Sequence, residues 1–132
     1  MKRTGRRLIV LDASVVLALA FLEPGWDVVP WGQEDLCIST VGLVEVVTKL
    51  IDGWPTGANI QGFLDPLTLT RVPLTDKQAI AAGLLRASTR SKGLSLGDRC
   101  CLALALDLGA PVMTADRVWA GLDLGVEVRL IR

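Results

Sequence analysis

Four consecutive apolar residues near the start of the chain, Leu8–Leu11, constrain the fold more than any other feature. A strand exposed on one face alternates apolar and polar residues, whereas an unbroken apolar run predicts a strand covered on both faces. Such strands occur mainly in parallel sheets that lie between two layers of helices. The chain has 132 residues, of which 51% are hydrophobic, so core material is plentiful. We therefore expect a single domain over residues 1–132.

Short strand-like runs alternate with helical segments along the rest of the chain. This order predicts an α/β fold, a three-layer α/β/α sandwich with a mainly parallel central sheet. The expected strands are 8–11, 36–38, 68–72, 112–114 and 126–131. The expected helices are 13–22, 40–51, 58–64, 75–90 (opened by a capping box at Thr75) and 96–108 (capped by Ser95), with a helical turn at 116–120.

The N-terminal segment also has features of a secretory signal. Lys2, Arg3, Arg6 and Arg7 precede an apolar stretch, but Asp12 interrupts that stretch near its middle. We therefore expect the first strand and helix to be retained. No uncharged apolar run approaches the ~18 residues needed to cross a bilayer. The prediction is a soluble protein with no membrane association.

The chain contains no histidine. This excludes the serine and cysteine triads and the histidine-based nucleases, because each of them needs an imidazole. Zinc is disfavoured as well, since the only thiols are Cys37, Cys100 and Cys101. We interpret these three as buried hydrophobic residues in a reducing cytoplasm.

Four acidic residues are expected near one edge of the sheet. In open α/β sheets the functional site lies beyond the carboxyl ends of the strands. Asp12 directly follows the first strand, and Asp116 lies just past the strand 112–114. Asp98 is in the first turn of its helix, and Glu45 lies on the helix after the second strand.

Each acid also has a structural interpretation. Asp98 can complete a capping box, Asp116 can cap the turn that follows it, and Glu45 can pair with Lys49 one helical turn on. Asp12 has the weakest such explanation, because an unpaired carboxylate between apolar segments is costly. For any single acid, a structural role and a functional role are about equally well supported.

Taken together, the acids favour function. Carboxylates at one sheet edge repel each other, which raises their proton affinity or requires a cation. Oxygen ligands without imidazole or thiolate suit Mg²⁺ or Mn²⁺. A Mg²⁺ ion held by carboxylates can activate water against a phosphodiester, and this chemistry needs no histidine.

The motifs that carry these acids resemble those of PIN-domain proteins, in the same order along the chain. They are Leu8–Ser14, Ser39–Val46, Leu94–Ala105 and Leu108–Asp116, and Trp119 follows at the place where relatives often carry an aromatic residue. The small single-domain form is similar to the VapC-type toxins of toxin–antitoxin systems.

The resemblance implies a Mg²⁺- or Mn²⁺-dependent endoribonuclease, commonly a homodimer, held inactive by a cognate antitoxin protein. It implies an acidic cluster of Asp12, Glu45, Asp98 and Asp116. Of these, Asp12, Asp98 and Asp116 would bind the metal, while the role of Glu45 stays open. Ser14 and Thr114 would order the carboxylates or a metal-bound water.

An RNA substrate needs cationic contacts as well. Arg86, Arg90, Lys92 and Arg99 lie close together in sequence, and Arg117 follows the fourth acid. These basic residues either contact RNA phosphates or form a solvated helix face, and the sequence favours neither. Arg99 and Arg117 are the preferred candidates for phosphate contact, because they adjoin acidic motifs.

Two other functions stay open. The chain can be a catalytically silent PIN-like binding or regulatory partner. It can also be a HAD-like phosphatase, although Ser14 stands where that mechanism needs a second acid. The apolar segments Ala13–Leu22 and Val41–Ile51 offer more hydrophobic surface than one small sheet needs, which favours a dimer and a groove for an antitoxin helix.

Overall fold

The computed structural model describes residues 7–132 and has the α/β architecture that the alternating pattern predicts. The strands are β1 (Leu8–Leu11), β2 (Asp35–Ser39), β3 (Thr70–Val72), β4 (Val112–Thr114) and β5 (Val128–Leu130). The helices are α1 (Ala13–Phe21), α2 (Thr40–Gly53), α3 (Ile60–Leu64), α4 (Asp76–Leu84), α5 (Arg86–Thr89) and α6 (Leu96–Leu108). Four 3₁₀ helices complete the described part: η1 (Trp26–Val28), η2 (Asp65–Leu67), η3 (Arg90–Lys92) and η4 (Arg117–Gly121).

The strands form one sheet in the order β3-β2-β1-β4-β5, and every neighbouring pair is parallel. The chain adds β2 and β3 on one side of β1 and then crosses to the other side to add β4 and β5. The order therefore reverses between β1 and β4. In sheets of this kind, ligands bind beyond the carboxyl ends of the strands at that reversal.

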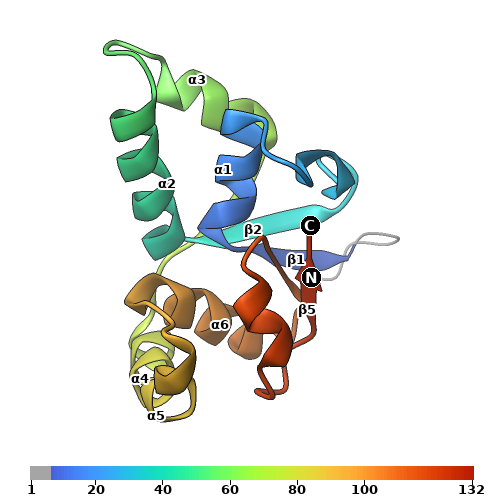
Figure 1. The fold of residues 1–132 in the computed structure, drawn as a ribbon, viewed down its shortest axis with the longest axis vertical. Helices are drawn as coiled ribbons and strands as arrows, with labels where there is room; N and C mark the ends of the chain where they lie inside the picture. Colours follow the sequence, from blue (N-terminus) through green and yellow to red (C-terminus); the bar gives the residue numbers. More distant parts are fainter. Residues whose placement is uncertain (1–6) are drawn as a thin grey trace.

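Two helical layers cover the sheet, which explains the unbroken apolar run in β1. Ile9 and Leu11 pack into a core with α1, α2 and α3, whereas Val10 packs into a second core with α6. Figure 1 shows α1, α2 and α3 on one side of the strands and α4, α5 and α6 on the other. The predicted three-layer sandwich is confirmed, and its sheet is parallel throughout.

One helix differs from the prediction. The single helix expected over 75–90 is wrong, because α4 ends at Leu84 and α5 begins only at Arg86. Three donors converge at the break: the Thr89 N–H and Oγ1 and the Ser88 Oγ all donate to the Leu85 carbonyl. The bond from the Thr89 N–H is an ordinary helical one, so the hydroxyl bonds do not displace it. At the break the Ala82 carbonyl accepts from the Arg99 Nη1 of α6 at 3.0 Å, where a continuous helix would have the bond from the Arg86 N–H.

The expected capping box at Thr75 is only half formed. The Thr75 Oγ1 accepts a hydrogen bond from the Gln78 N–H at 3.2 Å. The Gln78 side chain does not return the bond to Thr75, because its amide donates to Asp107 Oδ2 at 3.2 Å instead. The strands β3 and β5 and the helix α3 are also shorter than expected.

The expected first strand and first helix form as β1 and α1 from Leu8 onward, and their retention in the mature protein stays a prediction. The basic residues Lys2, Arg3 and Arg6 lie outside the described residues. Within the part that the structure describes, no helix is long and apolar enough to cross a membrane.

Candidate active site

Asp12 is the most deeply buried of the predicted acidic residues, with 5% of its surface exposed. It directly follows β1, and its N–H donates to the Met113 carbonyl of β4 at 3.0 Å. The Ser14 Oγ donates to Asp12 Oδ2 at 2.7 Å, and the Thr114 Oγ1 donates to the same oxygen at 3.0 Å. Two hydroxyls from different elements therefore hold one carboxylate oxygen.

The same hydroxyls connect α1 to the chain that leaves β4. The Ser14 Oγ accepts from the Ala115 N–H at 3.0 Å, and the Thr114 Oγ1 accepts from the Asp116 N–H at 3.0 Å. Each backbone donor occupies the acceptor side of a hydroxyl and directs its proton toward Asp12. The position of that carboxylate is thus fixed at the reversal point of the sheet.

Asp116 has a local structural role. It is exposed, and its Oδ1 accepts from the Val118 N–H at 3.0 Å as the N-cap of η4. Its interpretation as a cap is confirmed. The hydrogen bond from its N–H to Thr114 connects it indirectly to Asp12.

Asp98 also serves as a cap. Its Oδ2 accepts from the Ser95 N–H at 2.9 Å, and its own N–H donates to the Ser95 Oγ at 3.1 Å, so the capping box predicted for α6 is complete. The first turn of α6 places this carboxylate close enough to Asp12 and Glu45 for its negative charge to raise the pKa of both.

Glu45 reaches the same region from α2, and its place depends on a glycine. Its carboxylate lies directly against Gly97 in the first turn of α6, where an added Cβ would lie 2.1 Å from the Glu45 Oε1. The Oε1 is buried and has no hydrogen-bond partner among the described residues. Lys49 forms no direct ion pair with Glu45 in this part of the chain, although its charge lowers the pKa of that carboxyl slightly.

Burial is the main cause of the raised pKa values at this site. It raises the pKa of Asp12, the negative charge of Asp98 adds to the effect, and the bonds from Ser14 and Thr114 oppose it. Burial also raises the pKa of Glu45, followed by the charges of Asp12 and Asp98. Asp12, Glu45 and Asp98 therefore act on one another electrostatically, as expected for acids at one sheet edge.

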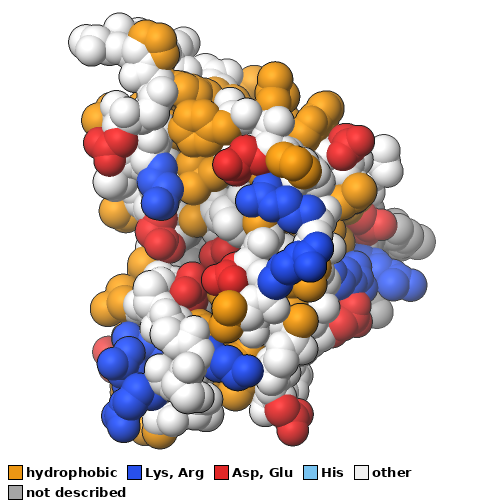
Figure 2. All heavy atoms as spheres, in the orientation of Figure 1, with side chains coloured by type: hydrophobic (Ala, Val, Ile, Leu, Met, Phe, Trp, Pro, Cys, Tyr) orange, Lys and Arg blue, Asp and Glu red, His pale blue; other side chains and the backbone are white. Residues whose placement is uncertain are grey.

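We refer to Asp12, Glu45, Asp98 and Asp116 as the acidic edge. Figure 2 shows acidic side chains gathered in a hollow where the part of the molecule formed by α1, α2 and α3 meets the part formed by α4, α5 and α6, with basic side chains on either side. Asp12, Glu45 and Asp98 act on one another electrostatically, whereas Asp116 is linked to Asp12 through its N–H bond to Thr114. Like charges that lie near one another attract a cation.

Whether a divalent metal fits this edge depends on the donor atoms. Across residues 7–132, no three aspartate, glutamate or cysteine side chains converge closely enough to form a ready-made metal site. The available donors are nevertheless all carboxylate or hydroxyl oxygens, and the Glu45 Oε1 is buried without a partner among these residues. Oxygen donors with excess negative charge fit Mg²⁺ or Mn²⁺.

The two predicted RNA-binding arginines have different environments. The Arg99 Nη1 donates to the Ala82 carbonyl of α4 at 3.0 Å, and its Nε is buried without a partner among the described residues. Arg117 is exposed beside Asp116. Among residues 7–132 the Arg117 side chain has no bond to give up on meeting a phosphate, whereas Arg99 would have to leave α4. Contact by either arginine stays a prediction.

A comparison with models of protein families decides the relationship. The PIN domain model matches residues 9–123, a span that contains the whole acidic edge. The chain belongs to the PIN domain family. The family and the fold give no support to the HAD-like alternative. A separate comparison with curated proteins finds no significant match for this chain.

Solved structures share this PIN fold. VapBC2 from Rickettsia felis, bound to a promoter DNA fragment, has a TM-score of 0.74 and 16% identity over 93% of this chain and 98% of that chain. DNA-bound VapBC from Salmonella typhimurium has a TM-score of 0.72 and 18% identity over 96% of this chain and 99% of that chain. VapBC-5 from Mycobacterium tuberculosis has a TM-score of 0.63 and 23% identity over 95% of this chain and 98% of that chain. At these identities the likeness concerns the fold.

Sequence analysis assigned no role to Gly97, although the structure makes it part of the site. Only the absence of a Cβ lets the Glu45 carboxylate lie against α6. Glycine is unfavourable inside a helix, by about 1 kcal/mol relative to alanine, so a glycine directly before Asp98 was the available signal.

Proposed function

We propose that this PIN domain, as a single domain over residues 1–132, is a metal-dependent endoribonuclease that cleaves RNA phosphodiesters. It acts in the cytoplasm as the toxin of a toxin–antitoxin pair. Membership of the PIN family supports a nuclease. The toxin assignment is supported by similarity in fold to the VapBC complexes.

One observation carries the proposal. Asp12 is buried at the reversal point of the sheet, within electrostatic reach of Asp98 and Glu45, and an oxygen of Glu45 has no partner in the described structure. A fold without a function here would gain by neutralising or removing these charges, because unpaired buried charges destabilise a protein. The arrangement is therefore best explained by a cation that binds during the reaction.

Each site residue has a proposed role in the reaction. Asp12, Asp98 and Asp116 would hold Mg²⁺ or Mn²⁺, which supplies activation of water and stabilisation of the leaving oxygen. Ser14 and Thr114 keep the Asp12 carboxylate oriented through their hydrogen bonds. Glu45, whose pKa is raised, is suited to accept a proton from the attacking water.

The test is RNA cleavage by the purified protein, with Mg²⁺, with Mn²⁺ and with EDTA. We expect cleavage that EDTA abolishes and that added metal restores. Asp12→Asn and Asp98→Asn should abolish it while the far-UV circular dichroism stays near normal, and Asp52→Asn, which changes an exposed acid at the end of α2, serves as the matched control. Cleavage in EDTA, or by Asp12→Asn, would overturn the mechanism. No cleavage of any RNA would favour the silent-partner alternative.

The proposed partners are the RNA substrate, a cognate antitoxin protein and a second copy of the chain. Exposed apolar side chains lie on α2 and at the end of α1, among them Leu22 at 71%, Val44 at 65% and Ile51 at 67% exposure. Exposed apolar side chains of this size commonly mark protein interfaces. Sedimentation of the purified protein tests the homodimer, and a monomer would contradict it.

A further inference from the structure

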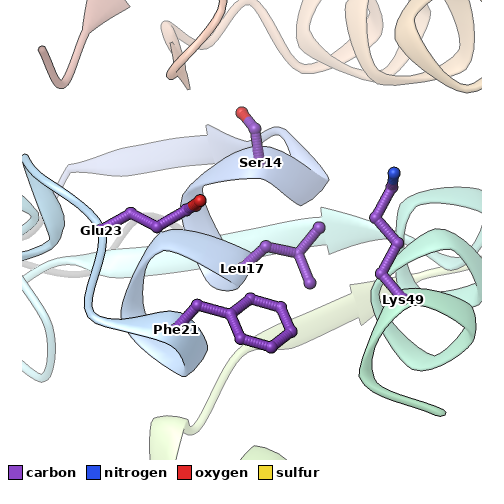
Figure 3. Close-up of a pocket in the computed structure, with 5 residues that line it drawn as sticks. All are labelled: Ser14, Leu17, Phe21, Glu23 and Lys49. Atoms are coloured by element: carbon purple, nitrogen blue, oxygen red, sulfur yellow. The ribbon is translucent and has the colours of Figure 1, made fainter. Parts of the chain in front are cut away.

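A pocket opens directly beside the acidic edge, between α1 and α2. Its cavity volume is about 270 Å³, and it is lined by Ser14, Leu17, Phe21, Glu23 and Lys49 (Figure 3). Ser14 is the residue whose hydroxyl donates to Asp12, so one end of the pocket begins at the proposed active site. The pocket is a little smaller than the ~300–1,000 Å³ of sites for drug-sized ligands, which suits a single flat ring system.

The apolar lining of the pocket is held in place. Leu17 is buried, and Phe21 is 39% exposed. One edge of that ring lies against Gly53, where an added Cβ would come within 2.8 Å of it, and the ring packs edge-on against Trp54 with centroids 6.2 Å apart. An aromatic surface fixed in advance loses little conformational freedom when a ligand binds.

Two opposite charges line the same pocket. Figure 3 shows Lys49 extending from α2 opposite the side chains of α1, with Glu23 on the other side of Leu17. Glu23 has only a long contact to Arg132, at 3.9 Å, which is beyond hydrogen-bond distance. Lys49 forms no ion pair among residues 7–132, and it is close enough to the acidic edge to affect Glu45. The pocket therefore presents a carboxylate whose ion pair with Arg132 is long, and a lysine without an ion pair among the described residues, around an apolar centre.

We infer that this pocket is a subsite for one unpaired base of the RNA, with guanine preferred. The inference rests on the proposed function. Proteins recognise single-stranded RNA by stacking bases on aromatic side chains and by hydrogen bonds to the base edges. The Watson–Crick edge of guanine carries two adjacent N–H donors for the Glu23 carboxylate, and its O6 and N7 accept from lysine. No other RNA base offers two adjacent ring-edge donors to one carboxylate.

The first experiment sequences the ends of RNA cut from a random library. The native protein should show guanine enriched about tenfold at one position beside the cut, the effect of a hydrogen bond to a charged group. Glu23→Gln should reduce that enrichment to less than about twofold at that position alone. Glu127→Gln is the matched control, since Glu127 also pairs with an arginine, Arg129, but lies outside the pocket.

The second experiment does not depend on cleavage. Each of the four 5′-ribonucleoside monophosphates is titrated into the ¹⁵N-labelled, metal-free protein. GMP should shift the amide signals of α1 through Glu23 at lower concentration than CMP does, and Glu23→Gln and Phe21→Leu should weaken the GMP response. GMP binding without any RNA cleavage would support the subsite and contradict the proposed function. Cleavage without guanine preference, together with no selective GMP shifts, would overturn the subsite alone.

Discussion

The two sides of the acidic edge are built by different forces. On the β1/β4 side, hydrogen bonds from Ser14 and Thr114 converge on Asp12. On the α2/α6 side, Glu45 is placed by close packing against Gly97, and one of its oxygens has no partner in the described chain. Both carboxylates are costly to bury, because the pKa of each is raised. On the first side two hydroxyl bonds offset part of that cost, whereas the buried Glu45 Oε1 receives no such bond among the described residues.

Among the variants that compare the two sides, Gly97→Ala should have the largest effect. The new Cβ would occupy the place of the Glu45 carboxylate, 2.1 Å from Oε1, and would force that side chain out of the site. Displacing a catalytic group by about 1 Å can reduce the rate about 100-fold, and we expect at least this loss of kcat/KM for RNA cleavage.

Gly83→Ala is the matched control, because a Cβ added at this position in α4 would have no other atom within 4 Å. It should keep its activity and gain up to about 1 kcal/mol in the free energy of unfolding. Equal activity of the two alanine variants would show that the packing of Glu45 on α6 has no functional role.

Thr114→Val tests the side that depends on hydrogen bonds. Thr114 has no exposed surface. The substitution removes its bond to Asp12 and leaves the Asp116 N–H without its acceptor. We expect the free energy of unfolding to fall by about 2 kcal/mol, measured by urea denaturation. Thr48→Val, which changes an exposed threonine of α2, should cost much less. A loss for Thr114→Val as small as that for the control would remove the distinction between the two sides.

The pH dependence of stability tests the unfavourable charge of Glu45, in EDTA. The folded state holds the Glu45 proton more tightly than the unfolded state, because burial and the charges of Asp12 and Asp98 raise its pKa above 4.5. Glu45 therefore lowers stability progressively as the pH rises through 4.5 to its folded pKa. Glu45→Gln should be slightly more stable than the native protein at pH 7, because solvent screens part of the unfavourable charge, and the difference should vanish near pH 4.

Glu127→Gln should respond with the opposite sign. Arg129 lowers the pKa of Glu127, so this carboxylate contributes to stability at neutral pH and loses that contribution as the pH falls through its folded pKa. Urea denaturation between pH 4 and pH 7 measures both variants. A Glu45→Gln variant less stable than the native protein at pH 7 would contradict the view that the α2/α6 side carries a cost.

The smallest effect concerns Cys101, which lies near both sides of the acidic edge. Burial raises the pKa of its thiol well above the usual value, and the charges of Asp12 and Asp98 act in the same direction. Burial raises the pKa of Cys37 to about 12. Neither thiol should react with a disulfide-exchange reagent at pH 8 until the protein is unfolded, because only the thiolate reacts. Rapid reaction of the native protein would show that the site opens to solvent.

The sequence predicted the architecture because its signals are local. The unbroken apolar run of β1, the caps at Ser39 and Ser95 and the stop at Gly109 each depend on neighbours within a few residues. The same holds for the capping roles of Asp98 and Asp116. The helix expected over 75–90 was wrong, because at the break between α4 and α5 the Ala82 carbonyl accepts from Arg99 of α6, a contact that depends on how the helices pack.

By itself, then, the sequence determined an α/β sandwich with acids near the ends of its strands. The spacing of apolar residues and the helix caps determine local structure through neighbours only a few residues away in the chain. Only the tertiary structure decided that Thr114 would bind Asp12 across 102 residues, that Glu45 would lie against Gly97, and that α1 and α2 would enclose a pocket next to both. These contacts depend on how whole elements pack, and packing is set by the shapes of side chains that meet from distant parts of the chain.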